Sequence, residues 1–210
     1  MVGEGSGKMS PARLIELYGL ATPSGITLLH AMRVDQAASF CTCASHASVR
    51  SLLGAAIEDE CDVALVDMEA GIEHLARSGG TLAFADVLLM VMEPTRKSVV
   101  TAARTRTLAH ELGIPRVAGV GNKAHSEADG EFFEAVCEEF GVPLAGVVPF
   151  HPGVSIADRM GCRVELPASG PVRDAIETIV DFVDSPEDLR AALEAEKARI
   201  ERRLAELAAR

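Results

Sequence analysis

Residues 116–122 read RVAGVGN, a nearly continuous apolar run of strand length. Three more runs of the same kind occur along the chain: DVALVDM (62–68), DVLLMVME (86–93) and LAGVVPF (144–150). Runs that lack polar alternation are typical of strands buried on both faces, as in a parallel sheet covered by helices. The pattern therefore predicts an α/β fold built on a mostly parallel sheet.

Helical patterns separate these runs. We expect one helix at about 98–112 and another at about 129–140, with Gly113 and Gly141 just beyond their ends, because glycine readily adopts the left-handed conformation that closes a helix. A strand, a helix and a second parallel strand connect by a right-handed crossover. The sheet is therefore expected to be flanked by helices.

The remaining segments carry weaker signals. Residues 11–18 predict a short helix, 26–30 a weak strand and 45–60 a further helix. The tail, 185–210, predicts a charged amphipathic helix, either packed on its own domain or forming a short coiled-coil contact between protomers. We expect residues 1–184 to form a partial nucleotide-binding domain, on grounds given below.

Composition restricts the class of partner. The chain has 210 residues, of which 48% are hydrophobic, enough for one α/β core. A net charge of -11 and a pI near 5.0 argue against nucleic-acid binding, which needs clustered cations, so small ligands or proteins are favoured. The apolar runs are too short to span a membrane and no leader pattern is seen, so we expect a cytoplasmic protein whose five cysteines are thiols or metal ligands.

Two acidic residues lie around the end of the apolar run at 62–68. The strand expected there ends in Asp67, and Glu69 and the small-residue turn Ala70-Gly71 come shortly after it. Ligands of open α/β sheets bind beyond the carboxyl ends of the strands, and an acid there can hold a magnesium-bound water. The alternative is that Asp67 only caps the next helix.

A polar pair ends the third run. In GVGNK (119–123), Asn122 presents an acceptor and two donors on one planar amide, a set that matches an edge of adenine. Lys123 follows it. The next strand ends in the proline-rich turn around Pro149 and Phe150, which could form a wall beside a base; alternatively, its prolines only terminate the strand.

The segment CTCASHAS (41–48) carries a Cys-x-Cys pair. Cys41 and Cys43 together offer two of the four ligands that Zn²⁺ or an all-sulfur site prefers. A symmetric dimer would supply the other two. His46 is a weaker candidate ligand, and the remaining cysteines, at 61, 137 and 162, are interpreted as small core hydrophobes.

The amino-terminal stretch GEGSGK (3–8) is similar to a phosphate-binding loop but fails its spacing. The loop requires G-x-x-x-x-G-K-[ST], whereas only three residues separate Gly3 from Gly7, and Met9 occupies the hydroxyl position. We therefore interpret this stretch as a flexible Gly/Ser segment.

Taken together, the Cys-x-Cys pair, VDMEAGIEHL (66–75), VMEPTRKS (91–98) and GNK (121–123) resemble the carbon monoxide dehydrogenase accessory ATPases of the CooC type. These nickel-insertion proteins belong to the MinD/ParA-like deviant-Walker P-loop class. The resemblance covers about residues 24–183. It implies an ATP-binding, MinD-like fold, a homodimer and a client metalloenzyme similar to carbon monoxide dehydrogenase.

The resemblance also implies roles for individual residues. Asp67 would be the magnesium-associated Walker B acid, and Glu69 to Gly71 would belong to the switch that senses the γ-phosphate. Asn122 and Lys123 would face the adenine, helped by the backbone near Pro149 and Phe150. Cys41 and Cys43 would form half of an intersubunit site for Ni²⁺ or Zn²⁺.

The chain departs from the family at its amino terminus, where we find neither the first strand with its K-G-G-x-G-K-[ST] loop nor the D-x-D-P acid pair. Either this is a shortened form of a complete ATPase, which we favour, or it is a short paralogue that has lost hydrolysis. We expect weak ATP binding and poor solubility, because a missing central strand leaves unpaired strand edges. A non-catalytic metal-binding or ParA/MinD-like interaction module is the alternative function.

Overall fold

The computed structural model describes residues 11–29, 63–68 and 85–185, which lie in two compact units divided between residues 84 and 85. The first unit contains the helix α1 (Pro11–Tyr18) and the short antiparallel strands β1 (Leu20–Ala21) and β2 (Thr27–Leu28). The α1 helix has the bounds that the sequence predicted, and the weak strand at 26–30 is confirmed for two residues.

The second unit is a parallel sheet with the strand order β3-β4-β5. Its strands are β3 (Val87–Met92), β4 (Arg116–Ala124) and β5 (Leu144–Pro149). The central strand, β4, is buried along almost its whole length, as its continuous apolar sequence predicted. The predicted parallel α/β fold is therefore confirmed in this unit.

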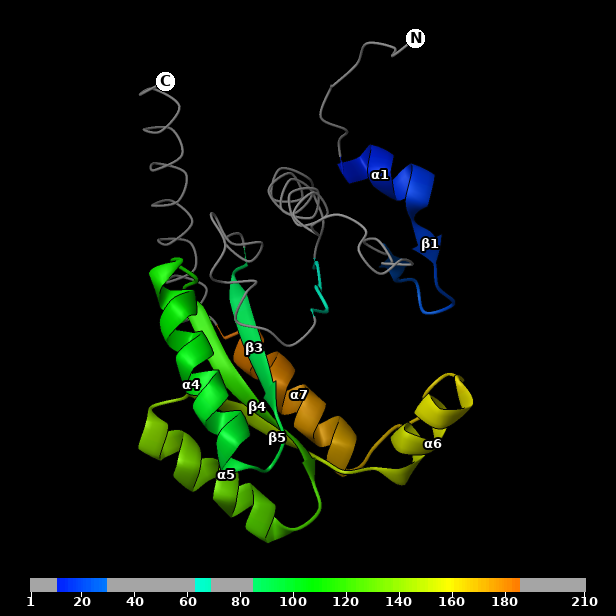
Figure 1. Ribbon diagram of the computed structural model, residues 1–210. Helices are drawn as coiled ribbons and strands as arrows, with labels where there is room; N and C mark the ends of the chain where they lie inside the picture. The colour runs from blue at the N-terminus through cyan, green and yellow to red at the C-terminus, as the bar shows by residue number, and fades with distance from the viewer. Residues whose placement is uncertain (1–10, 30–62, 69–84, 186–210) are drawn as a thin grey trace, which may run out of the picture. The chain divides into compact units, whose positions relative to one another are not determined.

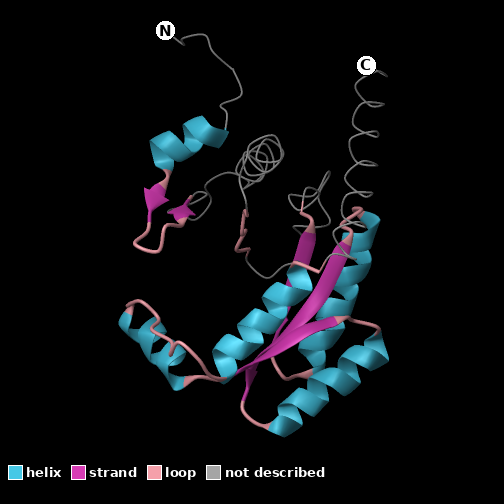
Figure 2. Ribbon diagram, turned by 180° about the vertical axis from the view of Figure 1, so that it is seen from behind, coloured by secondary structure: helices cyan, strands magenta, loops and turns pink. Residues whose placement is uncertain are grey.

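Two helices cover one face of the sheet and a third covers the other (Figures 1 and 2). The first two are α4 (Arg96–Glu111) and α5 (Glu127–Phe140), and the third is α7 (Pro171–Val183). On the α5 side, the ring of Phe133 is fully buried against Gly121 of β4. On the α7 side, Ile179 packs into a cluster with Ala118, Val120 and Ala145.

Local hydrogen bonds explain why both predicted helices begin two residues earlier than expected. Thr95 caps α4, since its hydroxyl accepts from the N–H of Ser98 at 3.3 Å. Asp129 in the first turn of α5 accepts from the N–H groups of His125 and Ser126 at 2.7 and 3.2 Å. These contacts satisfy amide groups that the helix itself leaves free, so they fix where each helix starts.

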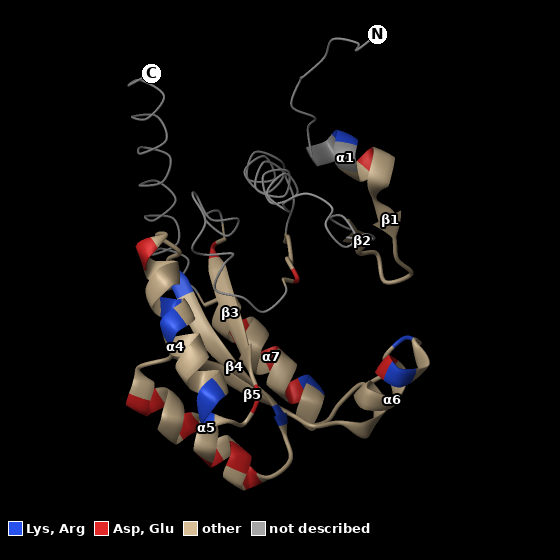
Figure 3. Ribbon diagram, in the orientation of Figure 1, with Lys and Arg blue, Asp and Glu red and all other residues tan. Residues whose placement is uncertain are grey.

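The neighbouring helices α4 and α5 carry opposite charge, α4 mainly basic and α5 acidic (Figure 3). The sequence of α4 carries four lysines and arginines and one glutamate, whereas α5 carries six acids and no base. One ion pair, between Arg96 and Glu139, joins them. The strongly negative net charge therefore does not extend over α4.

The predicted strand at 62–68 is not formed in its described part. Residues 63–68 have no regular secondary structure, and the side chains of Val63 and Leu65 are 81% and 92% exposed. A hydrophobic run becomes a strand only when a neighbouring backbone completes its hydrogen-bond ladder, and this segment has no such ladder within the described residues. The predicted helices at 45–60 and 185–210 lie outside the described residues, apart from Ser185.

Candidate functional site

The predicted polar residues Asn122 and Lys123 lie near the carboxyl end of β4, where the strand contains a bulge. The register pairs Gly121 with Val147 and Ala124 with Pro149, so two residues of β4 stand opposite the single Val148 of β5. Bulges re-aim side chains at the ends of strands and are common beside binding sites. Here the bulge includes both polar residues.

The turn after β5 lies beside this bulge. Pro149 is the last residue of β5, and the N–H of Phe150 donates to the carbonyl of Ala124 at 2.8 Å. The ring of Phe150, 39% exposed, stacks on His125 with ring centroids 4.5 Å apart. The strand register thus puts the predicted pair on β4 opposite Val148, next to the predicted wall on β5, whose own contacts are made to Ala124 and His125.

A shallow pocket of about 350 Å³ adjoins the wall. Pro149 and Val147 of β5 line it together with Gly130 of α5, Pro171 of α7 and the segment 124–127. Its walls combine apolar side chains with the polar start of α5, a mixture that suits a small planar ligand.

An ion pair between Lys123 of β4 and Glu93, which directly follows β3, connects the two strands. The ammonium of Lys123 lies 2.6 Å from a carboxylate oxygen of Glu93. This hydrogen bond, together with the attraction of the lysine's charge, lowers the pKa of Glu93 below its ordinary 4.5. The same hydrogen bond and charge raise the pKa of Lys123 above 10.5, with a smaller contribution from Asp158. Both groups are therefore ionised at neutral pH.

The amide of Asn122 is partly engaged within its own strand. Its Oδ1 accepts from the backbone N–H of Lys123 at 2.9 Å, and the side chain is half-buried. The two N–H bonds of the amide and one oxygen lone pair remain for a ligand.

The remaining predicted site residues belong to the first compact unit or lie outside the described residues. Asp67 is exposed and lies in the other compact unit. Glu69, Gly71, Cys41 and Cys43 lie outside the described residues, as does the phosphate-loop-like stretch at 3–8. Within the described ranges, no three His, Cys, Asp or Glu side chains gather as a metal site would require.

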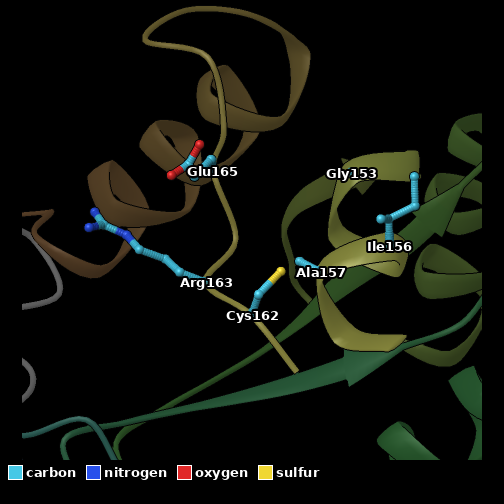
Figure 4. A pocket seen from close by; sticks show the side chains of 6 residues that line it. All are labelled: Gly153, Ile156, Ala157, Cys162, Arg163 and Glu165. Atoms are coloured by element: carbon cyan, nitrogen blue, oxygen red, sulfur yellow. The ribbon is translucent and has the colours of Figure 1, made fainter. Parts of the chain in front are cut away.

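Two cysteines can be compared with their predicted role as core hydrophobes. Cys137 is buried in α5, which confirms the interpretation, and burial raises the pKa of its thiol. Cys162 is exposed, which corrects it, because α6 (Pro152–Met160) ends at the left-handed Gly161 and the chain leaves the core there. Figure 4 shows Cys162 in a pocket of about 440 Å³ beside α6, with its sulfur directed toward Ala157.

Glu93 and His125 were missed as site residues by sequence reasoning. Glu93 ends the apolar run of β3, so its position at a strand terminus was a usable signal. Nothing in the local sequence marks His125, because its stacking partner lies 25 residues further on and is brought to it by strand pairing.

Comparison with known proteins supports the resemblance stated above. The chain is 39% identical over 138 residues, 66% of its length, to the carbon monoxide dehydrogenase accessory protein CooC of Rhodospirillum rubrum, covering 51% of that protein. It is 33% identical over 158 residues, 75% of its length, to an uncharacterised ATP-binding protein of Methanocaldococcus jannaschii, covering 60% of it. The chain thus spans about half to three-fifths of these relatives.

No family model matches the chain. Among solved structures, the MinD cell division protein of Aquifex aeolicus aligns with a TM-score of 0.42 and 19% identity, covering 49% of this chain and 45% of that one. In the part of the chain that the structure describes, no helix is long and apolar enough to cross a bilayer.

Proposed function

Since this chain is a CooC-like member of the MinD/ParA class, we propose that it is an accessory protein that binds ATP and that Asn122 contacts the adenine. The observation that supports this proposal is the bulge in β4, in which Asn122 stands opposite Val148, the residue before the turn of Pro149 and Phe150. Ligands of α/β sheets bind beyond the carboxyl ends of parallel strands, where these residues lie.

The residues at this place fit an adenine better than a phosphate. The amide of Asn122 offers donors and an acceptor in one plane, and the exposed ring of Phe150 offers an apolar face. Asp67 would act at a distance from the base, as the acid associated with Mg²⁺, and Glu69 to Gly71 would respond to the γ-phosphate. When bound, the metal would neutralise phosphate charge.

We further propose that ATP drives formation of a homodimer that brings together Cys41 and Cys43 of each protomer. Nucleotide that binds the closed dimer more tightly than the open form shifts the population toward the closed form. Four thiolates would then bind Ni²⁺ or Zn²⁺ for transfer to a client metalloenzyme. The 39% identity to a carbon monoxide dehydrogenase accessory protein supports this choice of client.

The adenine contact can be tested directly, because Asn122 is the only asparagine of the chain and Gln36 its only glutamine. In a ¹⁵N-labelled 210-residue chain, the side-chain amide signals therefore come from two residues. We expect ATP to shift the Asn122 pair and leave the Gln36 pair in place. The variant Asn122→Ala identifies the signal and should bind ATP more weakly. An Asn122 signal that stays fixed while ATP binds would refute the contact.

The metal site has its own test. The double variant Cys41→Ser, Cys43→Ser should lose stoichiometric Ni²⁺ or Zn²⁺ and metal-dependent dimerisation, measured by elemental analysis and light scattering. Cys162→Ser is the matched control, since it removes an exposed thiol outside the motif. Unchanged metal content in the double variant would exclude the Cys-x-Cys site. Metal binding without any response to ATP would favour the non-catalytic metal-binding module.

A further inference from the structure

The backbone of Lys123 has an unusual conformation. Its φ is 59°, and it is the one non-glycine residue with positive φ in the described part of the chain. A side chain disfavours this left-handed region because its Cβ crowds the neighbouring carbonyl oxygen. Such strain persists where surrounding contacts impose it, commonly at binding sites. The contacts of Lys123 therefore need an explanation.

The ion pair with Glu93 supplies one such contact. The register of β3 on β4 pairs Met92 with Gly121, so Glu93 follows directly beside Asn122. The backbone of Glu93 is itself tied to the start of α4, since its N–H donates to the hydroxyl of Ser98 at 3.2 Å. Glu93 thus holds the Lys123 ammonium from a fixed point on the neighbouring strand.

The second contact controls the amide of Asn122. The N–H of Lys123 points at this side chain and can only donate, so the atom 2.9 Å away must be the amide oxygen. Turning the amide by half a circle would bring its NH₂ group against that N–H and lose the hydrogen bond. The N–H of the peptide group between Asn122 and Lys123 therefore fixes which end of the amide carries the acceptor, and the left-handed backbone and the ion pair hold residue 123 in place beside it.

We propose that Glu93 and Lys123 are positioning residues that lock the amide of Asn122 in one orientation, and that this lock selects adenine over guanine. The inference rests on the proposed function and deepens it. On its Watson–Crick edge, adenine presents an amino donor beside a ring acceptor, whereas guanine presents a carbonyl acceptor beside a ring N–H donor. If the amide of Asn122 is held in one orientation, its donor and acceptor pair with adenine and face like groups on guanine. If the amide turns freely, it can pair with either base.

This inference changes the role expected for Lys123. The resemblance implied that its side chain faces the adenine, but its ammonium is held by Glu93. Its contribution comes from its backbone and from the ion pair. Removing the side chain should therefore affect the choice of base through Asn122.

The test compares ATP with GTP on the full chain by following the Asn122 amide signal during titration. Glu93→Gln should reduce the ratio of ATP to GTP affinity by a few-fold, because an exposed ion pair contributes modestly and its loss releases the ammonium of Lys123. Glu93→Asp, which keeps the carboxylate, should restore part of the ratio. Glu139→Gln is the matched control, because it removes the carboxylate of a similarly exposed ion pair at a distance from the bulge.

The variant Lys123→Gly distinguishes a role in holding the Asn122 amide from a role in stabilising the fold. Glycine adopts positive φ without strain, so this variant should unfold at a higher temperature than a Lys123→Ala variant. It should nevertheless lose part of the ATP selectivity, because without the ion pair to Glu93 the glycine backbone, which still carries the N–H, is no longer held beside the amide. A purely structural ion pair would leave selectivity unchanged in both variants.

The outcomes distinguish this inference from the proposed function. If Asn122→Ala weakens ATP binding while Glu93→Gln and Lys123→Gly keep the wild-type ratio, the lock is wrong and the adenine contact stands. If the wild-type Asn122 signal does not respond to ATP, the adenine contact fails and the lock fails with it. A reduced ratio in both variants, with the Glu139→Gln ratio intact, supports the lock.

Discussion

Replacing Gly121 with alanine should destabilise the sheet unit by about 1–3 kcal/mol. Gly121 precedes Asn122 in β4 and faces α5. A β-carbon added there would lie 2.7 Å from Cδ2 of Phe133, 2.9 Å from its Cε2 and 3.0 Å from its Cγ. Non-bonded carbon atoms normally meet at about 3.5–4.0 Å, so the new methyl group would overlap the ring by roughly 1 Å.

The ring cannot relieve this overlap by moving into solvent, because Phe133 is fully buried. Either β4 or α5 must shift, and a close-packed interior resists both movements. The chain has no tryptophan, so far-UV circular dichroism during urea denaturation is the suitable measurement. We expect the midpoint urea concentration to fall while the slope of the transition is retained.

Two controls make the reasoning specific. Gly130→Ala adds the same methyl group inside α5, where nothing lies within 4 Å, and should stabilise the chain by up to about 1 kcal/mol. The double variant Gly121→Ala, Phe133→Leu should unfold at a higher urea concentration than the sum of the two single changes predicts. A Gly121→Ala chain as stable as the wild type would refute the steric argument.

Three other outcomes are expected. Arg116→Met should cost about 1–3 kcal/mol, because the buried guanidinium donates to the last carbonyls of α7 and its loss leaves them without that partner; urea denaturation measures this. Cys162 should react with iodoacetamide far faster than Cys137, read by peptide mass spectrometry, because one thiol is exposed and burial raises the pKa of the other. The selectivity for ATP should be constant between about pH 6 and pH 9. Because the pKa of Glu93 is lowered, the ion pair is lost on acidification only below pH 4.5. Because the pKa of Lys123 is raised, the ion pair is lost on the basic side only above pH 10.5. A selectivity that changes near neutral pH would contradict this assignment.

The apolar runs predicted β3, β4 and β5 well because strands buried on both faces need no polar alternation. The predicted range of 116–122 for the central strand differs from the observed Arg116–Ala124 only in the bulge and its last residues. The run at 62–68 has the same pattern, and its described residues, 63–68, form no strand. An apolar sequence shows that a segment can be buried. Forming a strand also requires hydrogen bonds to the backbone of an adjacent strand.

Within the candidate site, the sequence by itself determined that Asn122 would stand near the end of a buried strand and that Pro149 and Phe150 would end the next one. Only the tertiary structure decided that Glu93, 30 residues before Lys123, would hold its ammonium. The physical reason is that the local sequence determines which residues lie at the end of a strand. The pairing of β4 with β3 and β5, together with the bulge in β4, determines which residues of different strands lie side by side and how the amide of Asn122 is directed.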